Sequence, residues 1–317
     1  QSFWPSWDWQ PWNSTTVHIT NDKNKMQQQA TSNKQQHGSC IMSKWDKDDF
    51  CNVANSIVMN NSNHTSKNPT LAIVGDSLSF EHYSSLVQLL GLPSRETDQL
   101  TARKYNRNIV QSACNWTLIY RRSDYLEHVP SILKVNEPNV LVINRGAHYV
   151  DDQRFMSELF NTIKALQDWQ INCSFLRTNQ TCWLFVRSTV PGHPQCKNYN
   201  MPSNDTYEME ALVANLSNYA SRKAQNFHWW DMKHQNNLML DAFSKSGLAY
   251  EVIDAYDLNI LRPDLHRSPD CLHSCYPGKM DVYNQLLLHF LKRNILSPPK
   301  LTNLTLTPQN DLSQPSI

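Results

Sequence analysis

The stretch 70-TLAIVGDSLSF-80 is a short apolar run that ends at Gly75, Asp76 and Ser77. An apolar run of this length, bounded by turn residues, predicts a buried strand. The segment 79–91 that follows has its apolar residues at helical spacing and ends in Gly91, which predicts a helix. Strand, turn and helix in this order place Ser77 just past the carboxyl end of a strand.

Apolar strands alternate with helical patterns along the rest of the chain. Further strands are predicted at 139–144, 182–190 and 249–256, and further helices at 151–169, 205–225 and 279–294. This alternation predicts an α/β fold in which helices cover both faces of a mainly parallel sheet. Ligands of such sheets bind outside the carboxyl ends of the strands, which is where Ser77 lies.

Composition divides the 317 residues into three parts. Residues 1–39 form a Trp-rich and then polar N-terminal segment, and residues 297–317 form a tail rich in Pro, Ser, Thr and Asn. Both are predicted to be loose or linker-like. The Trp cluster near the N-terminus is a substrate platform or a packing element. Residues 40–296 are predicted to form a single domain.

The net charge and the cysteine content indicate which partners and which cellular compartment to expect. The formal net charge of +1 gives no reason to expect binding to nucleic acid or to an anionic membrane. Eight cysteines without a CxxC pair fit four disulfides whose pairing stays open. Acceptor sites for N-glycosylation lie at Asn13, Asn60, Asn63, Asn115, Asn172, Asn179, Asn204, Asn215 and Asn303. Together these features predict the secretory pathway, although the acceptor sites of an Asn-rich cytosolic chain can also arise by chance.

Membrane and targeting signals are not visible in the sequence. No apolar run approaches the ~20 residues that span a bilayer, and no signal peptide stands at the start. If the chain enters the secretory pathway as predicted, we expect that an N-terminal signal or membrane anchor was removed or is missing from this sequence.

Ser77 has two interpretations. A serine hydroxyl becomes a nucleophile when a base removes its proton, so a catalytic Ser77 needs a histidine elsewhere in the chain. The alternative is structural, because Asp76, Ser77 or Ser79 can cap the helix that follows.

Candidate partners lie in 261-LRPDLHRSPDCLHSCYPGKMD-281, which contains two Asp/His pairs. Asp270 and His273 are three residues apart, a spacing that puts both side chains on one face of a helical turn. Asp264 and His266 are two apart and point in different directions in a strand or a helix. We therefore predict that His273 is the base and that Asp270 orients it.

The same segment also offers zinc ligands in His266, Cys271, His273 and Cys275. The order Cys-x-His-x-Cys is not a usual zinc spacing, and the many glycosylation acceptor sites favour disulfides over thiolates. No metal site is predicted.

Five motifs occur in one order along the chain: WDWQP at 7–11, VGDSLS at 74–79, VLVINRGAHY at 140–149, FVRSTVPGHPQC at 185–196 and LRPDLHRSPDCLHSCYPGKMDVYNQLL at 261–287. With them the chain resembles the trichome-birefringence-like or PC-esterase family, which belongs to the GDSL/SGNH-type acyl-ester enzymes. The pairing of GDSLS with DCLHSCYPG is the most specific part of this resemblance.

The resemblance implies a three-layer α/β/α SGNH-like fold with Ser77 as nucleophile, His273 as base and Asp270 as its orienting group. It also implies a Golgi enzyme with an N-terminal membrane anchor that transfers acetyl groups to polysaccharide hydroxyls. The expected co-substrate is an acetyl donor, either acetyl-CoA or an acetylated intermediate. No bound cofactor and no nucleic-acid partner are expected.

Two features depart from the wider SGNH pattern. No glycine lies between Gly91 and Gly146, and the third block reads INRGAH instead of Gly-x-Asn-Asp. The oxyanion donors are therefore predicted to be the backbone N–H of Ser77 and the side chain of Asn144, which is otherwise a satisfied amide at a strand end. Further substrate contacts are predicted for Arg145, His148 and His193, each of which is otherwise a hydrogen-bonded loop residue. The N-terminal part is also shorter and more polar than the family's usual Cys-rich lead-in.

Two alternatives to acetyl transfer remain at this point. A carbohydrate acetyl-esterase would use the same three residues and pass the acetyl group to water. A secreted glycan-binding protein would keep the fold without catalysis.

Overall fold

The computed structural model describes residues 46–59, 68–93, 108–176, 182–215, 222–267, 269–275 and 278–296. All of them belong to one compact unit, Met42–Ile317. The N-terminal segment 1–39 and the tail 297–317 lie outside the described residues, so the predictions about them stay predictions.

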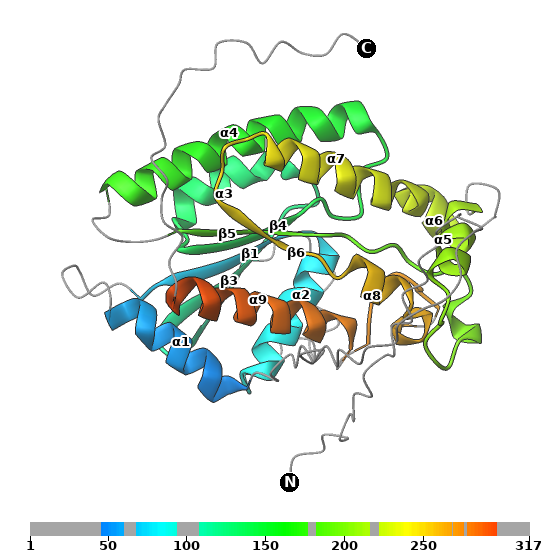
Figure 1. Ribbon diagram of the computed structural model, residues 1–317, viewed down its shortest axis with the longest axis horizontal. Coiled ribbons are helices and arrows are strands. Elements are labelled where there is room, and N and C mark those ends of the chain that lie inside the picture. Colours follow the sequence, from blue (N-terminus) through cyan, green and yellow to red (C-terminus); the bar gives the residue numbers. More distant parts are fainter. Residues whose placement is uncertain are drawn as a thin grey trace, which may run out of the picture. The chain divides into compact units, whose positions relative to one another are not determined.

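A six-stranded sheet in the order β2-β3-β1-β4-β5-β6 forms the centre of this unit (Figure 1). Strands β3, β1, β4, β5 and β6 run parallel, and β2 pairs with β3 in the antiparallel direction at one edge. The prediction of a mainly parallel sheet is therefore confirmed. The strands are β1 (Thr70–Gly75), β2 (Asn108–Ala113), β3 (Trp116–Arg122), β4 (Val140–Asn144), β5 (Trp183–Arg187) and β6 (Tyr250–Ile253).

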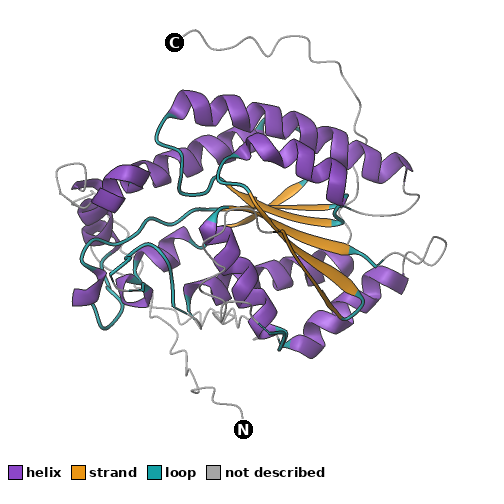
Figure 2. Ribbon diagram, turned by 180° about the vertical axis from the view of Figure 1, so that it is seen from behind, coloured by secondary structure: helices purple, strands orange, loops and turns teal. Residues whose placement is uncertain are grey.

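Helices cover both faces of the sheet, as Figures 1 and 2 show from opposite sides. One layer holds α1 (Lys47–Met59), α2 (Ser77–Leu89) and α9 (Lys279–Leu296), and the other holds α3 (Val129–Asn136), α4 (Asp152–Leu176) and α7 (Met232–Ser244). The shorter helices α5 (Thr206–Ala214), α6 (Arg222–Phe227) and α8 (Tyr256–Ile260) complete the unit. The three-layer α/β/α architecture is confirmed.

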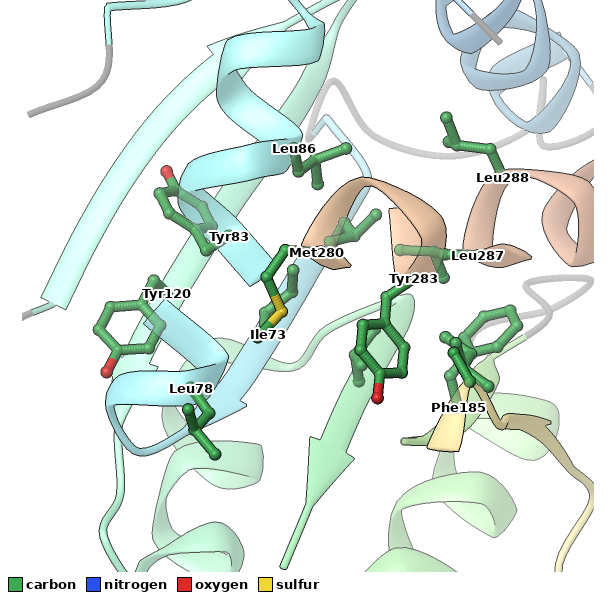
Figure 3. Close-up of a cluster of buried hydrophobic side chains, with 14 of the residues drawn as sticks. Ile73, Leu78, Tyr83, Leu86, Tyr120, Phe185, Met280, Tyr283, Leu287 and Leu288 are labelled. Atoms are coloured by element: carbon green, nitrogen blue, oxygen red, sulfur yellow. The ribbon is translucent and has the colours of Figure 1, made fainter. Parts of the chain in front are cut away.

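Each face of the sheet has its own hydrophobic core, which explains why the central strands β1, β4 and β5 are largely apolar. In β1, Leu71 and Ile73 belong to the core shared with α2 and α9, whereas Ala72 and Val74 belong to the core shared with α4 and α7. Side chains alternate between the two faces of a strand, so a strand buried on both faces must be apolar throughout. Figure 3 shows the first core, where side chains of α2 and α9 gather with residues of three strands: Ile73, Leu78, Tyr83, Leu86, Tyr120, Phe185, Met280, Tyr283, Leu287 and Leu288.

Three predicted elements end earlier than the sequence suggested, among them the strand predicted over 249–256, because β6 ends at Ile253 and α8 begins at Tyr256. The third predicted strand was expected to run to residue 190, but β5 ends at Arg187, where its pairing with β6 stops. Beyond that point Asn236 of α7 bonds the backbone of Thr189 in both directions, which replaces the sheet hydrogen bonds. The helix predicted over 205–225 is two elements, because α5 ends at Ala214 and α6 begins at Arg222, with 216–221 outside the described residues.

The antiparallel hairpin of β2 and β3 was not predicted from the sequence. Its two-residue turn consists of Cys114 and Asn115, both with positive φ (52° and 64°). Asn-Gly is the usual signal for such a turn, and Cys-Asn does not carry it. A disulfide from Cys114 to Cys51 of α1 holds the turn instead.

Candidate functional site

The order of the parallel strands fixes where a ligand should bind. Chain order and spatial order of the strands diverge at β1, because the next parallel strand, β3, lies on one side of it and β4 lies on the other. In open α/β sheets the crevice outside the carboxyl ends of two strands that diverge in this way is the usual ligand site. Ser77 follows β1 and the segment Arg145–His148 follows β4, so both flank this switch point.

The turn between β1 and α2 is closely packed around Gly75. Its φ is +151°, and a Cβ placed there would lie 2.3 Å from Ser79 Oγ and 2.6 Å from the side-chain amide of Asn144. Larger residues at this position therefore clash. The hydroxyl of Tyr120 in β3 donates to the carbonyls of Gly75 (3.1 Å) and Asp76 (3.0 Å), which holds the turn from the other side. Burial raises the pKa of Tyr120, so the hydroxyl keeps its proton and remains a donor.

Asp76, not Ser77, caps α2. Asp76 is fully buried, its Oδ1 accepts from the N–H of Leu78 (3.0 Å), and its Oδ2 accepts from the N–H of Ala147 beyond β4 (2.6 Å). Ser79 is also engaged, since its hydroxyl bonds the Asn144 side chain. Ser77 is half-buried and its hydroxyl makes no hydrogen bond with any residue that the structure describes, His273 included. In resting enzymes a nucleophile often meets its base only when substrate binds.

Asp270 and His273 form the pair that their spacing predicted. Asp270 Oδ2 lies 2.8 Å from His273 Nδ1, and Asp270 Oδ1 accepts from the N–H groups of Leu272 and His273, both at 3.0 Å. Both side chains are partly exposed. A carboxylate on Nδ1 keeps the proton there and leaves Nε2 as the basic nitrogen.

The other Asp/His pair is not a pair in the structure. Asp264 binds Arg262 through both carboxylate oxygens, at 2.9 and 2.8 Å. His266 is buried, with Nε2 2.6 Å from His193 Nδ1 and Nδ1 3.0 Å from the carbonyl oxygen of Leu272. His266 thus supports the turn that carries His273 and does not take its place.

The arrangement of the cysteines argues against a zinc site in this segment. Cys271 forms a disulfide with Cys196, so its sulfur is not a free thiolate. No group of three potential metal ligands occurs among the residues that the structure describes.

Three of the four residues predicted to contact the oxyanion or the substrate are buried, and their polar atoms bond other protein groups. Turned to suit its neighbours, the Asn144 amide donates to Ser79 Oγ (2.7 Å) and accepts from Arg187 Nη2 (2.6 Å). Arg145 donates to the carbonyl of Tyr149 (2.9 Å) and to Gln235, and burial lowers its pKa to about 10. His193 faces His266 and the carbonyl of Ile260. These contacts favour a structural role for Asn144, Arg145 and His193.

The other predicted oxyanion donor is the backbone N–H of Ser77. It lies in the first turn of α2, where the helix offers no acceptor for it.

His148 is the fourth, and its side chain is 22 % exposed. Its Nε2 lies 3.8 Å from Asp76 Oδ2 and 3.8 Å from Asp124 Oδ1, and its ring meets Phe227 edge-on. Of the four predicted residues, His148 is therefore the one whose side chain is partly exposed to solvent.

Residues that the sequence did not single out complete the site: Tyr120, Glu81, Arg187 and Asp124. Arg187 and Glu81 are charged yet 2 % and 1 % exposed; Arg187 lies within the motif 185–196, and Glu81 lies two residues after the motif 74–79. A charged residue within an otherwise apolar strand, as in 183-WLFVR-187, was the one available signal in the sequence.

The buried histidines predict a stability that falls in acid. Burial, followed by the nearby Lys279 ammonium, lowers the pKa of His193 to about 4 and that of His266 well below 6.5. The unfolded chain takes up these protons near pH 6.5, so stability is complete above pH 6.5 and declines from there towards pH 4. For His193 alone we expect a loss of about 2 kcal/mol between pH 7.5 and pH 5. Urea unfolding of the wild type and of His193→Asn at both pH values measures it, and equal pH dependence of the two would contradict it.

Disulfides and exposed acceptor sites agree with an oxidising compartment. Cys51–Cys114, Cys173–Cys182 and Cys196–Cys271 are bonded, and Cys275 is free among the described residues. Disulfides of this kind form in secreted and secretory-pathway proteins. The acceptor asparagines that the structure describes are all exposed: Asn115, Asn172, Asn204 and Asn215. Within the described residues, none of the helices is both long and apolar enough to cross a bilayer.

Comparisons with known proteins add little to this geometry. No protein-family model matches the chain, and no curated protein is similar to it in sequence. Among solved structures, the chain is similar to the crystal structure of the lipase Lip_vut3 from a goat rumen metagenome, with 12 % sequence identity, a TM-score of 0.35, and coverage of 69 % of this chain and 96 % of that one. A match at this level carries no argument about activity.

Proposed function

We propose that this protein is an O-acetyltransferase of the SGNH type that moves acetyl groups onto polysaccharide hydroxyls in the secretory pathway, in the Golgi lumen. The observation that carries the proposal is the Asp270–His273 hydrogen bond of 2.8 Å, in a turn attached to the helix that begins with Ser77. The resemblance of the GDSLS and DCLHSCYPG motifs to the trichome-birefringence-like family supplies the reaction class.

The first half-reaction forms an acetyl-serine. Ser77 Oγ attacks the carbonyl carbon of the acetyl donor, and its proton passes to His273 Nε2. The oxyanion that develops is stabilised by the free N–H of Ser77. When the tetrahedral intermediate collapses, the bond to the donor oxygen or sulfur breaks and the leaving group takes the proton from His273.

The second half-reaction returns the enzyme to its starting state. A sugar hydroxyl gives its proton to His273 and attacks the acetyl-serine carbonyl, after which the bond to Ser77 Oγ breaks and Oγ takes the proton back. Water in place of the sugar would give free acetate and make the protein an esterase. Transfer therefore depends on a bound sugar that reaches the intermediate before water does.

The test follows the acetyl group. The purified chain is incubated with acetyl-CoA or p-nitrophenyl acetate and a mixture of neutral oligosaccharides, and the products are identified by mass spectrometry. Acetylated sugar is the expected product, and Ser77→Ala should form none while it remains folded. Free acetate alone would replace the transferase proposal with an esterase. Tight sugar binding with neither product would identify a glycan-binding protein.

A further inference from the structure

A buried carboxylate joins the helix of the nucleophile to the turn of the base. Glu81 lies four residues after Ser77 in α2, so the two side chains share one helix face about 6 Å apart along the axis. Glu81 is 1 % exposed. Its Oε1 accepts from the backbone N–H of Ser274 (2.9 Å) and from Arg267 Nη2 (2.7 Å), and its Oε2 accepts from the same N–H at 3.1 Å.

Ser274 is the residue directly after His273. Ser77 is therefore connected to His273 through one turn of α2, the Glu81 carboxylate and the peptide unit between His273 and Ser274. Burying a carboxylate costs several kcal/mol unless charged or polar partners compensate it, and here those partners belong to the turn that carries the base. On this basis, and on the proposed function, we propose that Glu81 is a positioning residue that sets the distance between Ser77 and His273.

Other anchors of the turn come from its own flanking residues and from the loop beyond β5. The N–H of Arg267 donates to the carbonyl of His273 (2.8 Å), and His266 Nδ1 faces the carbonyl of Leu272. The Cys196–Cys271 disulfide ties the turn to the loop beyond β5. These contacts shape the turn, whereas Glu81 attaches it to α2.

The Asp270–His273 pair forms within the turn, where Asp270 holds His273 Nδ1 and the N–H groups of Leu272 and His273. Loss of Glu81 should therefore leave this pair intact and shift it as a unit relative to Ser77. Misplacement of a reacting group by about 1 Å costs about 100-fold in rate. A residue that merely stabilised the fold would lower the melting temperature and leave the reactivity of the folded protein unchanged.

The experiment measures how fast Ser77 reacts with a fluorophosphonate, a probe that needs the nucleophile and its base but no sugar. Glu81→Ala should react about 100-fold more slowly than the wild type below its melting temperature. Glu81→Gln keeps an oxygen for the Ser274 N–H and should lose about tenfold. The pH dependence of labelling should keep its wild-type shape in both variants, because His273 keeps Asp270. Hydrogen exchange of peptides covering 269–275 should be faster in Glu81→Ala.

The matched control is Asp281→Asn. Asp281 of α9 binds Ser85 of α2 and accepts from the N–H of Gly278, and among the described residues it has no hydrogen bond to the His273 turn. It should lower stability and leave labelling within about twofold of the wild type. Equal labelling rates for wild type and Glu81→Ala, or equal losses in Glu81→Ala and Asp281→Asn, would overturn the inference. A wild type that does not react at Ser77 overturns the proposed function, and the inference falls with it.

Discussion

Asp270→Asn is expected to slow acetylation of Ser77 by about 10³- to 10⁴-fold while the protein stays folded. The asparagine oxygen can still accept from the N–H groups of Leu272 and His273, so the turn keeps its shape. Its NH₂ group then faces His273 Nδ1 and needs an acceptor there. The proton of the imidazole moves to Nε2, which can no longer act as a base towards Ser77.

Asp264→Asn is the matched control for this substitution. Asp264 belongs to the other Asp/His pair of the same segment but binds Arg262. It should leave the acetylation rate within about twofold of the wild type, as measured by the burst of p-nitrophenol from p-nitrophenyl acetate. A larger loss in Asp264→Asn than in Asp270→Asn would show that the wrong carboxylate has been assigned.

Removal of the Cys196–Cys271 disulfide by a double Cys→Ser substitution should lower the free energy of unfolding by about 4 kcal/mol. The two cysteines are 75 residues apart, and a cross-link that closes a long loop removes much entropy from the unfolded chain. Cys271 is also two residues before His273, so the turn that carries the base loses an anchor. We therefore expect slower labelling of Ser77 as well as lower stability, measured by urea unfolding and by fluorophosphonate kinetics.

The Cys173–Cys182 disulfide provides the comparison. Its cysteines are 9 residues apart, at the end of α4 and the start of β5, so its removal should cost about 2.5 kcal/mol. Labelling of Ser77 should not change, because neither cysteine contacts the β1 turn or the segment 269–275 in the described structure. Equal effects of the two double substitutions on labelling would argue against a link between the Cys196–Cys271 bond and the base.

The apolar strands were predictable because burial on both faces leaves a continuous hydrophobic run, as in 71-LAIV-74 and 140-VLVI-143. The β2–β3 hairpin was not, because its turn depends on a disulfide from Cys114 to a distant helix and not on local turn residues. The end of β5 was also missed, since Asn236 replaces the sheet partner from a helix about fifty residues away in sequence.

Among the site residues, the Asp270–His273 contact was predicted from the spacing of a helical turn. The segment is instead a non-helical turn in which Cys271 has a φ of 57°, and Asp270 Oδ1 holds the N–H groups of Leu272 and His273. Asn144, Arg145 and His193 carried the same polar signal as His148, yet they lie in the interior and His148 does not. Their burial depends on which neighbours pack over the strand ends, and no local pattern contains that information.

The stretch 70-TLAIVGDSLSF-80 by itself determined a buried strand, a tight turn and a helix with Ser77 at the junction, since each depends on local apolar periodicity and on the turn at Gly75. Only the tertiary structure decided that Asp76 is the cap and that the Ser77 hydroxyl makes no hydrogen bond with the described residues. Asp76 also accepts from the N–H of Ala147, which lies beyond another strand. The attachment of the base to the nucleophile through Glu81 is likewise a contact between residues almost two hundred positions apart. Such contacts form when helices and loops pack at one edge of the sheet, which is why they cannot be read from either segment alone.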